Sequence, residues 1–232
     1  MQNAYFSYNF TAMVYVKKLT LNDFQENTYL VYDETKECCI IDPGCYYQSE
    51  RELLISTIKE YKLKPVLLLN THCHLDHVFG NKFIKDTYKI PFLANKNELP
   101  IIESGPTVAA AYGIDFNDIV KPDKFLNDGD EVTFGNTTLK VLFTPGHSPG
   151  SISFFNDEDK FVISGDVLFY NSIGRYDFPL SDYDTLMNSI FNKLLTLEDE
   201  VKVFSGHGPE TFIGYEKKSN PFLIEFRETH LN

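Results

Sequence analysis

The sequence contains no tryptophan and few cysteines, with four among 232 residues. Cys38 and Cys39 are adjacent, so in an extended strand they would point to opposite sides, and no zinc-ribbon spacing occurs. A chain of this length can bury a sizeable core without disulfide bonds. We therefore expect free thiols, which favour a reducing compartment and point to the cytoplasm. The absence of tryptophan supports no functional conclusion.

Basic residues are also scarce. Lysine and arginine total 21 against 33 aspartate and glutamate residues, which gives a net charge of −12. No basic cluster is longer than a pair. Because an acidic surface repels phosphate backbones, we expect no nucleic-acid partner.

Long hydrophobic runs are missing as well. No apolar run approaches the roughly 20 residues that a membrane-spanning helix needs, and we expect no membrane partner. Residues 1–12 lack the basic and apolar regions of a signal peptide. The first clear strand pattern begins at Met13. We therefore predict a loosely ordered extension over residues 1–12 and a single domain over residues 13–232.

The remaining sequence has strong hydrophobic periodicity. Residues 49–63 predict a helix, because Leu54, Ile58 and Tyr61 recur at helical spacing after a capping box from Ser49 to Glu52. Strands are predicted where apolar residues alternate or run together, at residues 13–21, 27–33, 38–44, 65–71, 89–95, 137–144, 151–156, 161–166 and 201–208.

Further helices are expected between and after these strands. Residues 81–88 and 220–226 predict short helices, and residues 181–197 predict a capped amphipathic one. Residues 98–123 fit either a helix or a flexible lid over a cleft. Strands and helices mix without a linker-like segment, so we predict an α/β fold with four layers, αββα, in which helices flank two mixed β-sheets.

Metal-competent side chains follow four apolar strands, mostly beside glycine: His72, His147, Asp166 and His207. The stretch "THCHLDH" at residues 71–77 contributes three more: His74, Asp76 and His77. Any one of these residues could be a polar turn or capping group. Together they indicate a metal site, because rigid strands with tight loops can hold ligands in place. The sixth histidine, His230, lies outside the clusters and is expected to be solvated.

Imidazole and carboxylate ligands both suit zinc, with iron and manganese as alternatives. Seven such ligands are too many for one tetrahedral ion and suit two. One aspartate bridging both ions would leave each with three further ligands, and a shared water would complete the site. Two ions about 3.5–4 Å apart lower the pKa of such a water and polarise the bond that it attacks.

The "THCHLDH" motif, followed in order by His147, Asp166 and His207, resembles the metallo-β-lactamase superfamily over residues 13–212. The resemblance implies that Asp166 bridges two metals and that Asp76 helps to orient the nucleophilic water. It also implies that Asp42, in "IIDPG", lies just behind the metals, although Asp42 equally suits a turn before Pro43. The implied ligands of the first metal are His72, His74 and His147, and those of the second are Asp76, His77 and His207.

Within the superfamily, the resemblance favours the compact glyoxalase II-like group. Zinc β-lactamases usually have cysteine where Asp166 stands and another residue where His77 stands, which argues against antibiotic hydrolysis. The stretch "GDVLFYNSIGRYDFP" resembles the glyoxalase II-like members, although Tyr176 occupies a position that often holds a small hydroxyl residue. Only 25 residues follow His207. That leaves no room for the helical domain with which glyoxalase II grips glutathione, so we expect the metal chemistry to carry over but not the glutathione specificity.

The expected activity is therefore hydrolysis of a small acyl thioester that resembles S-lactoylglutathione. A metal-bridging hydroxide would attack the carbonyl, and a thiol of pKa about 8.5 leaves readily as a thiolate without a dedicated acid. Tyr170 and Arg175 are candidate substrate contacts, because they follow the bridging aspartate. A buried pair of Arg175 with Asp177 is the alternative for that arginine.

Other functions remain open at this point. A persulfide dioxygenase of the same superfamily would bind one iron through His74, His147 and Asp166. Lactone hydrolysis is chemically feasible, whereas a nuclease is disfavoured by the net charge of −12. A non-catalytic metal module would need a closed site, and this ligand set leaves room for solvent. The sequence is compatible with a homodimer but does not define the oligomeric state.

Overall fold

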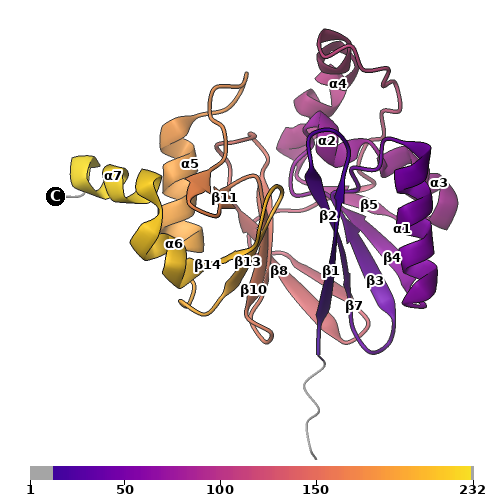
Figure 1. The fold of residues 1–232 in the computed structure, drawn as a ribbon, viewed down its shortest axis with the longest axis horizontal. Coiled ribbons are helices and arrows are strands. Elements are labelled where there is room, and N and C mark those ends of the chain that lie inside the picture. The colour runs from indigo at the N-terminus through magenta and orange to yellow at the C-terminus, as the bar shows by residue number, and fades with distance from the viewer. Residues whose placement is uncertain (1–12, 231–232) are drawn as a thin grey trace, which may run out of the picture.

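The computed structural model describes residues 13–230, so the extension predicted at residues 1–12 lies outside the described residues. Within this range two six-stranded mixed sheets pack face to face, and helices cover both outer faces (Figure 1). The predicted αββα arrangement is confirmed. In the first sheet the order is β1 (Tyr15–Leu21), β2 (Glu26–Tyr32), β3 (Glu37–Ile41), β4 (Lys64–Leu69), β5 (Phe92–Ala94) and β6 (Lys124–Phe125).

The second sheet, like the first, contains both parallel and antiparallel strands. Its β10 and β13 are parallel, and its other neighbouring strands are antiparallel. The order is β14 (Thr211–Phe212), β13 (Lys202–Ser205), β10 (Phe161–Gly165), β9 (Ile152–Asn156), β8 (Thr137–Phe143) and β7 (Glu131–Phe134). A short hairpin, β11 (Leu168–Phe169) and β12 (Ser172–Ile173), follows β10.

The helices form the two outer layers. In Figure 1, α1 (Gln48–Glu60) and α3 (Asn81–Tyr88) cover the first sheet. The second sheet is covered by α5 (Tyr183–Ser189), α6 (Ile213–Ser219) and α7 (Pro221–His230). At the upper edge of the sandwich lie α2 (Leu75–Val78) and α4 (Leu99–Ala111).

Successive side chains along a strand point to opposite faces of the sheet, so the buried residues form three hydrophobic cores between these layers. On β3, Cys38 and Ile40 pack under α1 with Leu54, whereas Cys39 and Ile41 pack between the two sheets. A third core lies between the second sheet and α5, α6 and α7. Each sheet is therefore buried on both faces, as its long apolar strands predict. The four cysteines are free and buried, which confirms the expected thiols.

The start of α1 differs from the sequence prediction, and α4 resolves part of an ambiguous segment. α1 begins at Gln48, and Glu50 in its first turn reaches back to the residues before the helix. The Glu50 carboxylate accepts from the backbone N–H of Tyr46 and Tyr47 at 2.9 and 3.0 Å. The predicted pair of Ser49 and Glu52 does not form the cap, because Ser49 is itself helical and exposed. In the ambiguous segment 98–123, α4 confirms the helix over its first half.

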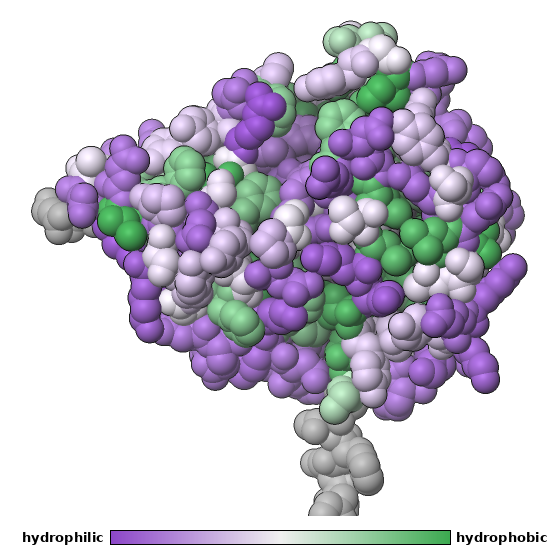
Figure 2. Space-filling view, in the orientation of Figure 1, coloured by the Kyte–Doolittle hydropathy of each residue, from purple (hydrophilic) through white to green (hydrophobic). Residues whose placement is uncertain are grey.

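The surface contains both hydrophobic and hydrophilic residues. Figure 2 shows hydrophobic residues in patches among hydrophilic ones that predominate on this face. Among the described residues, no helix has the length and apolar character that crossing a membrane requires.

Candidate metal centre

The predicted ligands lie on loops that leave the strands at one edge of the sandwich. His72 follows β4, and His74 precedes the single turn of α2, which carries Asp76 and His77. The other three lie on the loops that follow β8, β10 and β13 of the second sheet: His147, Asp166 and His207. All seven residues are brought together, although they come from strand ends far apart in the sequence.

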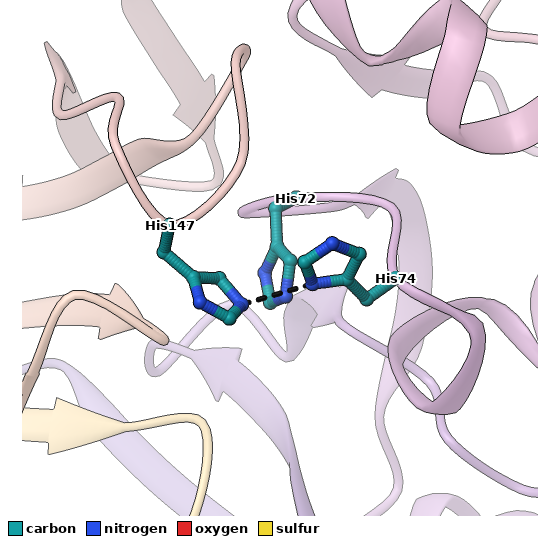
Figure 3. Close-up of side chains that lie close together, drawn as sticks. All are labelled: His72, His74 and His147. Atoms are coloured by element: carbon teal, nitrogen blue, oxygen red, sulfur yellow. Dashed lines mark hydrogen bonds between the residues drawn. The ribbon is translucent and has the colours of Figure 1, made fainter. Parts of the chain in front are cut away.

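The first ligand group consists of His72, His74 and His147, whose ligand atoms lie within 4.8 Å of one another (Figure 3). His74 Nδ1 and His147 Nε2 face each other at 2.9 Å. Burial lowers the pKa of all three imidazoles, to about 3 for His74. These shifts favour neutral imidazoles, the form in which histidine binds a metal.

The second ligand group consists of Asp76, His77 and His207, again with ligand atoms within 4.8 Å of one another. His207 Nε2 lies 3.1 Å from Asp76 Oδ2. Burial alone would lower the pKa of His77, but the carboxylates of Asp76 and Asp166 outweigh that effect and raise it. The Asp76 carboxylate gives this group a negatively charged side chain, which the first group lacks.

Asp166 lies between the two ligand groups. Its Oδ2 is 3.6 Å from His147 Nε2 and 3.5 Å from His207 Nε2, and its Oδ1 is 3.5 Å from His77 Nε2. Three buried atoms that converge here have no hydrogen-bond partner: His72 Nε2, His77 Nε2 and Asp166 Oδ1. Burying polar atoms unpaired is costly. The donor set and these unpaired atoms fit divalent metal ions, which would serve as their common partner.

Backbone carbonyls hold two of the histidines in orientation. His147 Nδ1 donates to the Arg175 carbonyl at 2.8 Å, and His207 Nδ1 donates to the Phe24 carbonyl at 3.0 Å. In the neutral form of each ring, a proton on Nδ1 leaves the lone pair of Nε2 available to a metal ion.

Asp42 also lies within ligand distance of His72 and His77, but its oxygens are already occupied. Its carboxylate accepts hydrogen bonds from Thr71 N–H at 2.7 Å, from the Thr71 hydroxyl and from Asn70 Nδ2. The fourth partner is His77 Nδ1, at 3.2 Å. Asp42 therefore contacts His77 on the side away from Asp166, and its φ of 50° suits the turn before Pro43.

Two buried glutamates near the centre were not predicted. Glu26 Oε1 has no hydrogen-bond partner and lies 3.9 Å from His77 Nδ1, and burial raises the pKa of this carboxyl well above its usual value. Glu98 accepts hydrogen bonds from the loops that carry Cys73 and Ser148. Both are isolated carboxylates in the sequence, so no spacing or motif marks them.

The two predicted substrate contacts lie on the surface near the ligand loops. Arg175 pairs with Asp177 through two contacts of 2.9 Å, but both side chains are more than 60% exposed, so the predicted burial of this pair is wrong. The Arg175 guanidinium also stacks over the ring of Phe178, which packs against His74. Tyr170 is 47% exposed and stacks on Tyr215.

Comparison with known proteins agrees with this geometry. The family model of the metallo-beta-lactamase superfamily matches residues 21–207. The chain is 40% identical to hydroxyacylglutathione hydrolase GloC of Haemophilus influenzae over 210 residues, which cover 90% of this chain and 97% of that protein. The chain belongs to the metallo-beta-lactamase superfamily, whose members bind divalent metals, and it is a metallo-hydrolase.

Two solved structures have closely similar folds. The B3 metallo-beta-lactamase BLEG-1 is 37% identical with a TM-score of 0.82, and the match covers 91% of this chain and 99% of that one. TTHA1623, solved in a di-iron-bound form, is 38% identical with a TM-score of 0.81, and the match covers 90% and 100% of the two chains.

Proposed function

We propose that this chain is a binuclear-metal hydrolase of acyl thioesters that resemble S-lactoylglutathione. The observation that carries the proposal is the position of Asp166 between two groups of three ligands, with unpaired buried atoms from both sides directed to the same space. The likeness to hydroxyacylglutathione hydrolase GloC supports this class of substrate. Zinc suits the mixed imidazole and carboxylate ligands best, and iron and manganese are the alternatives.

In this proposal, the residues divide the work between the two ligand groups. His72, His74 and His147 hold the first ion, and Asp76, His77 and His207 hold the second, with Asp166 bridging. When bound, the two ions supply a water of lowered pKa and polarise the thioester carbonyl. Asp42 and the carbonyls of Phe24 and Arg175 fix the imidazole tautomers, so that ligand nitrogens need little rearrangement when substrate arrives.

Substrate would enter beside the ring of Phe178, which packs against His74 and His147 at ring-centroid distances of 5.3 and 5.9 Å. Arg175 stands over the same ring at 4.0 Å, where its guanidinium is exposed and paired with Asp177. We propose Arg175 and, further out, Tyr170 as contacts for the polar carrier of the thioester. A thiolate leaving group needs no protein acid.

The decisive test combines metal content with two activities. We expect two divalent ions per chain and hydrolysis of S-lactoylglutathione by the purified protein. Asp166→Ala should lose both metal and activity, whereas Asp157→Ala, at the other end of β10 and 75% exposed, should keep both. One bound iron, with oxygen uptake on glutathione persulfide and no thioester cleavage, would instead identify the dioxygenase. A fully active Asp166→Ala variant would refute the bridging role.

Hydrolysis of β-lactams is the second candidate, favoured by the likeness to the B3 metallo-beta-lactamase structure. The same preparation should be assayed with a chromogenic cephalosporin and with S-lactoylglutathione under identical metal loading. We expect kcat/KM to be higher for the thioester. A higher value for the cephalosporin would replace the thioester proposal.

A further inference from the structure

Glu98 is a fully buried carboxylate outside both ligand groups. It ends the 3₁₀ turn Lys96–Glu98, which leads directly into α4. Its Oε2 accepts a hydrogen bond from the Cys73 amide at 2.7 Å. Its Oε1 accepts from the Ser148 hydroxyl and from the Gly150 amide, both at 2.6 Å. Hydrogen bonds to a buried carboxylate are among the strong ones, so this side chain fixes what it touches.

These three donors belong to the two loops that form the first ligand group. Cys73 lies between His72 and His74, on the loop that leaves β4 of the first sheet. Ser148 directly follows His147, on the loop that leaves β8 of the second sheet. One carboxylate therefore joins two ligand loops that come from different sheets.

The Glu98 carboxylate is tightly packed. A Cβ atom at Gly150 would lie 2.8 Å from Glu98 Cγ and Oε1, so the second loop rests directly on the glutamate. Next to it, Asn97 Nδ2 donates to the Pro149 carbonyl at 3.4 Å. A displacement of Glu98 would therefore displace the loop that positions His147.

We propose that Glu98 is a positioning residue of the metal centre: it holds the two loops at a fixed separation and thereby sets the affinity of His72, His74 and His147 for their metal ion. Glu98 does not contact the ion in this arrangement. The inference rests on the part of the proposed function that places an ion at the first ligand group, and it does not depend on the identity of the substrate.

The test replaces Glu98 by its uncharged isostere. In Glu98→Gln, one terminal atom becomes an NH₂ group, which would face an N–H or O–H donor and cannot accept from it. We expect the affinity for one of the two zinc ions to fall by about 10–100-fold, as for other residues that orient metal ligands. The second ion, at Asp76, His77 and His207, should bind as in the wild type.

Glu216→Gln provides a matched control. Glu216 is also fully buried and sits in α6, in the opposite helical layer. Its carboxylate accepts from the Thr211 hydroxyl, the Asn171 amide and Asn220 Nδ2. The control thus removes a buried carboxylate with the same number of donors, away from the first ligand group.

Two measurements on each protein separate positioning from general destabilisation. The first is zinc affinity, by competition of the metal-free protein with a chromophoric chelator. The second is the thermal midpoint of the metal-free protein. Both variants should lower the midpoint, but only Glu98→Gln should weaken zinc binding. Wild-type affinity in Glu98→Gln, or equal weakening in Glu216→Gln, would overturn the proposal.

If Glu98→Gln does not fold, Ser148→Ala removes one of the three hydrogen bonds and keeps the carboxylate. A smaller loss of affinity for one ion is then expected, and an unchanged affinity overturns the proposal. Failure of the thioester proposal is recognised separately. A wild type that binds two ions but cleaves no thioester refutes the substrate alone, whereas one that binds no divalent ion refutes both.

Discussion

At the scale of single residues, Asp42 offers a test of how the ligands are oriented. Its carboxylate holds His77 Nδ1 and the Thr71 hydroxyl, which in turn contacts His72 Nδ1 at 3.1 Å. Asp42→Asn keeps the shape but places an NH₂ group against these donors. We expect kcat/KM and zinc affinity to fall by about 10–100-fold, measured by hydrolysis assays and metal analysis.

Asp33→Asn is the control for that prediction. Asp33 is as buried as Asp42 and accepts hydrogen bonds from Thr35, Asn136 and Thr137, but it follows the far end of β2. This substitution should reduce stability and leave zinc affinity unchanged. Full activity and full zinc content in Asp42→Asn would show that His77 needs no support from Asp42.

The same scale shows what the sequence can predict of the centre. The convergence of the seven candidate ligands was predictable because each follows a recognisable strand or belongs to one dense motif. Glu98 and Glu26 were not, because a lone carboxylate looks the same in a sequence whether it is solvated or buried. Their roles depend on loops that meet only in the folded chain. Arg175 and Asp177 were predicted as a pair, but their exposure follows from packing that a sequence does not contain.

At the scale of elements, the start of α1 can be used to test which of two residues caps the helix. The sequence pattern predicts Ser49, whereas in the structure Glu50 caps the helix and also accepts from the Asn22 amide at 2.6 Å. Glu50→Ala should therefore lower the free energy of unfolding by about 1–3 kcal/mol. Ser49→Ala, at an exposed helical position, should change it by less than about 0.5 kcal/mol. Urea titration of both variants provides the measurement, and equal effects would contradict this assignment of the cap.

The capping result explains why element boundaries are harder to predict than elements. Periodicity located α1, α3 and α5, because their apolar faces repeat every three or four residues. It could not choose between Ser49 and Glu50, which differ by one position, because the choice depends on the approach of Asn22 from the β1–β2 turn. The segment after Glu98 was ambiguous because it contains residues that disfavour a helix. α4 carries a proline inside the helix, at Pro106, and glycine beside it.

At the scale of the whole molecule, the ligands come from both sheets. His72, Asp76 and their neighbours leave the first sheet, whereas His147, Asp166 and His207 leave the second. Buried strands predicted the layers, but periodicity alone does not show which edges of two sheets meet. The convergence was inferred instead from the metal-competent side chains that follow strands in both halves of the sequence, and the structure brings these residues together. Each candidate ligand group contains residues from both sheets, so an ion bound to it would link the two halves of the sandwich.

This link predicts that metal binding stabilises the whole fold. An ion that binds only the folded state adds RT ln(1 + [L]/Kd), or about 4 kcal/mol at 1,000 times Kd. For a chain of 232 residues that corresponds to a rise of about 8–16 °C in the thermal midpoint. Zinc added to chelator-treated protein should produce this rise in a calorimetric scan. His207→Ala should reduce it, because one ligand of the second group is lost, whereas His230→Ala, at the exposed end of α7, should retain it. A midpoint that does not respond to zinc would show that the two halves are not joined through a bound ion.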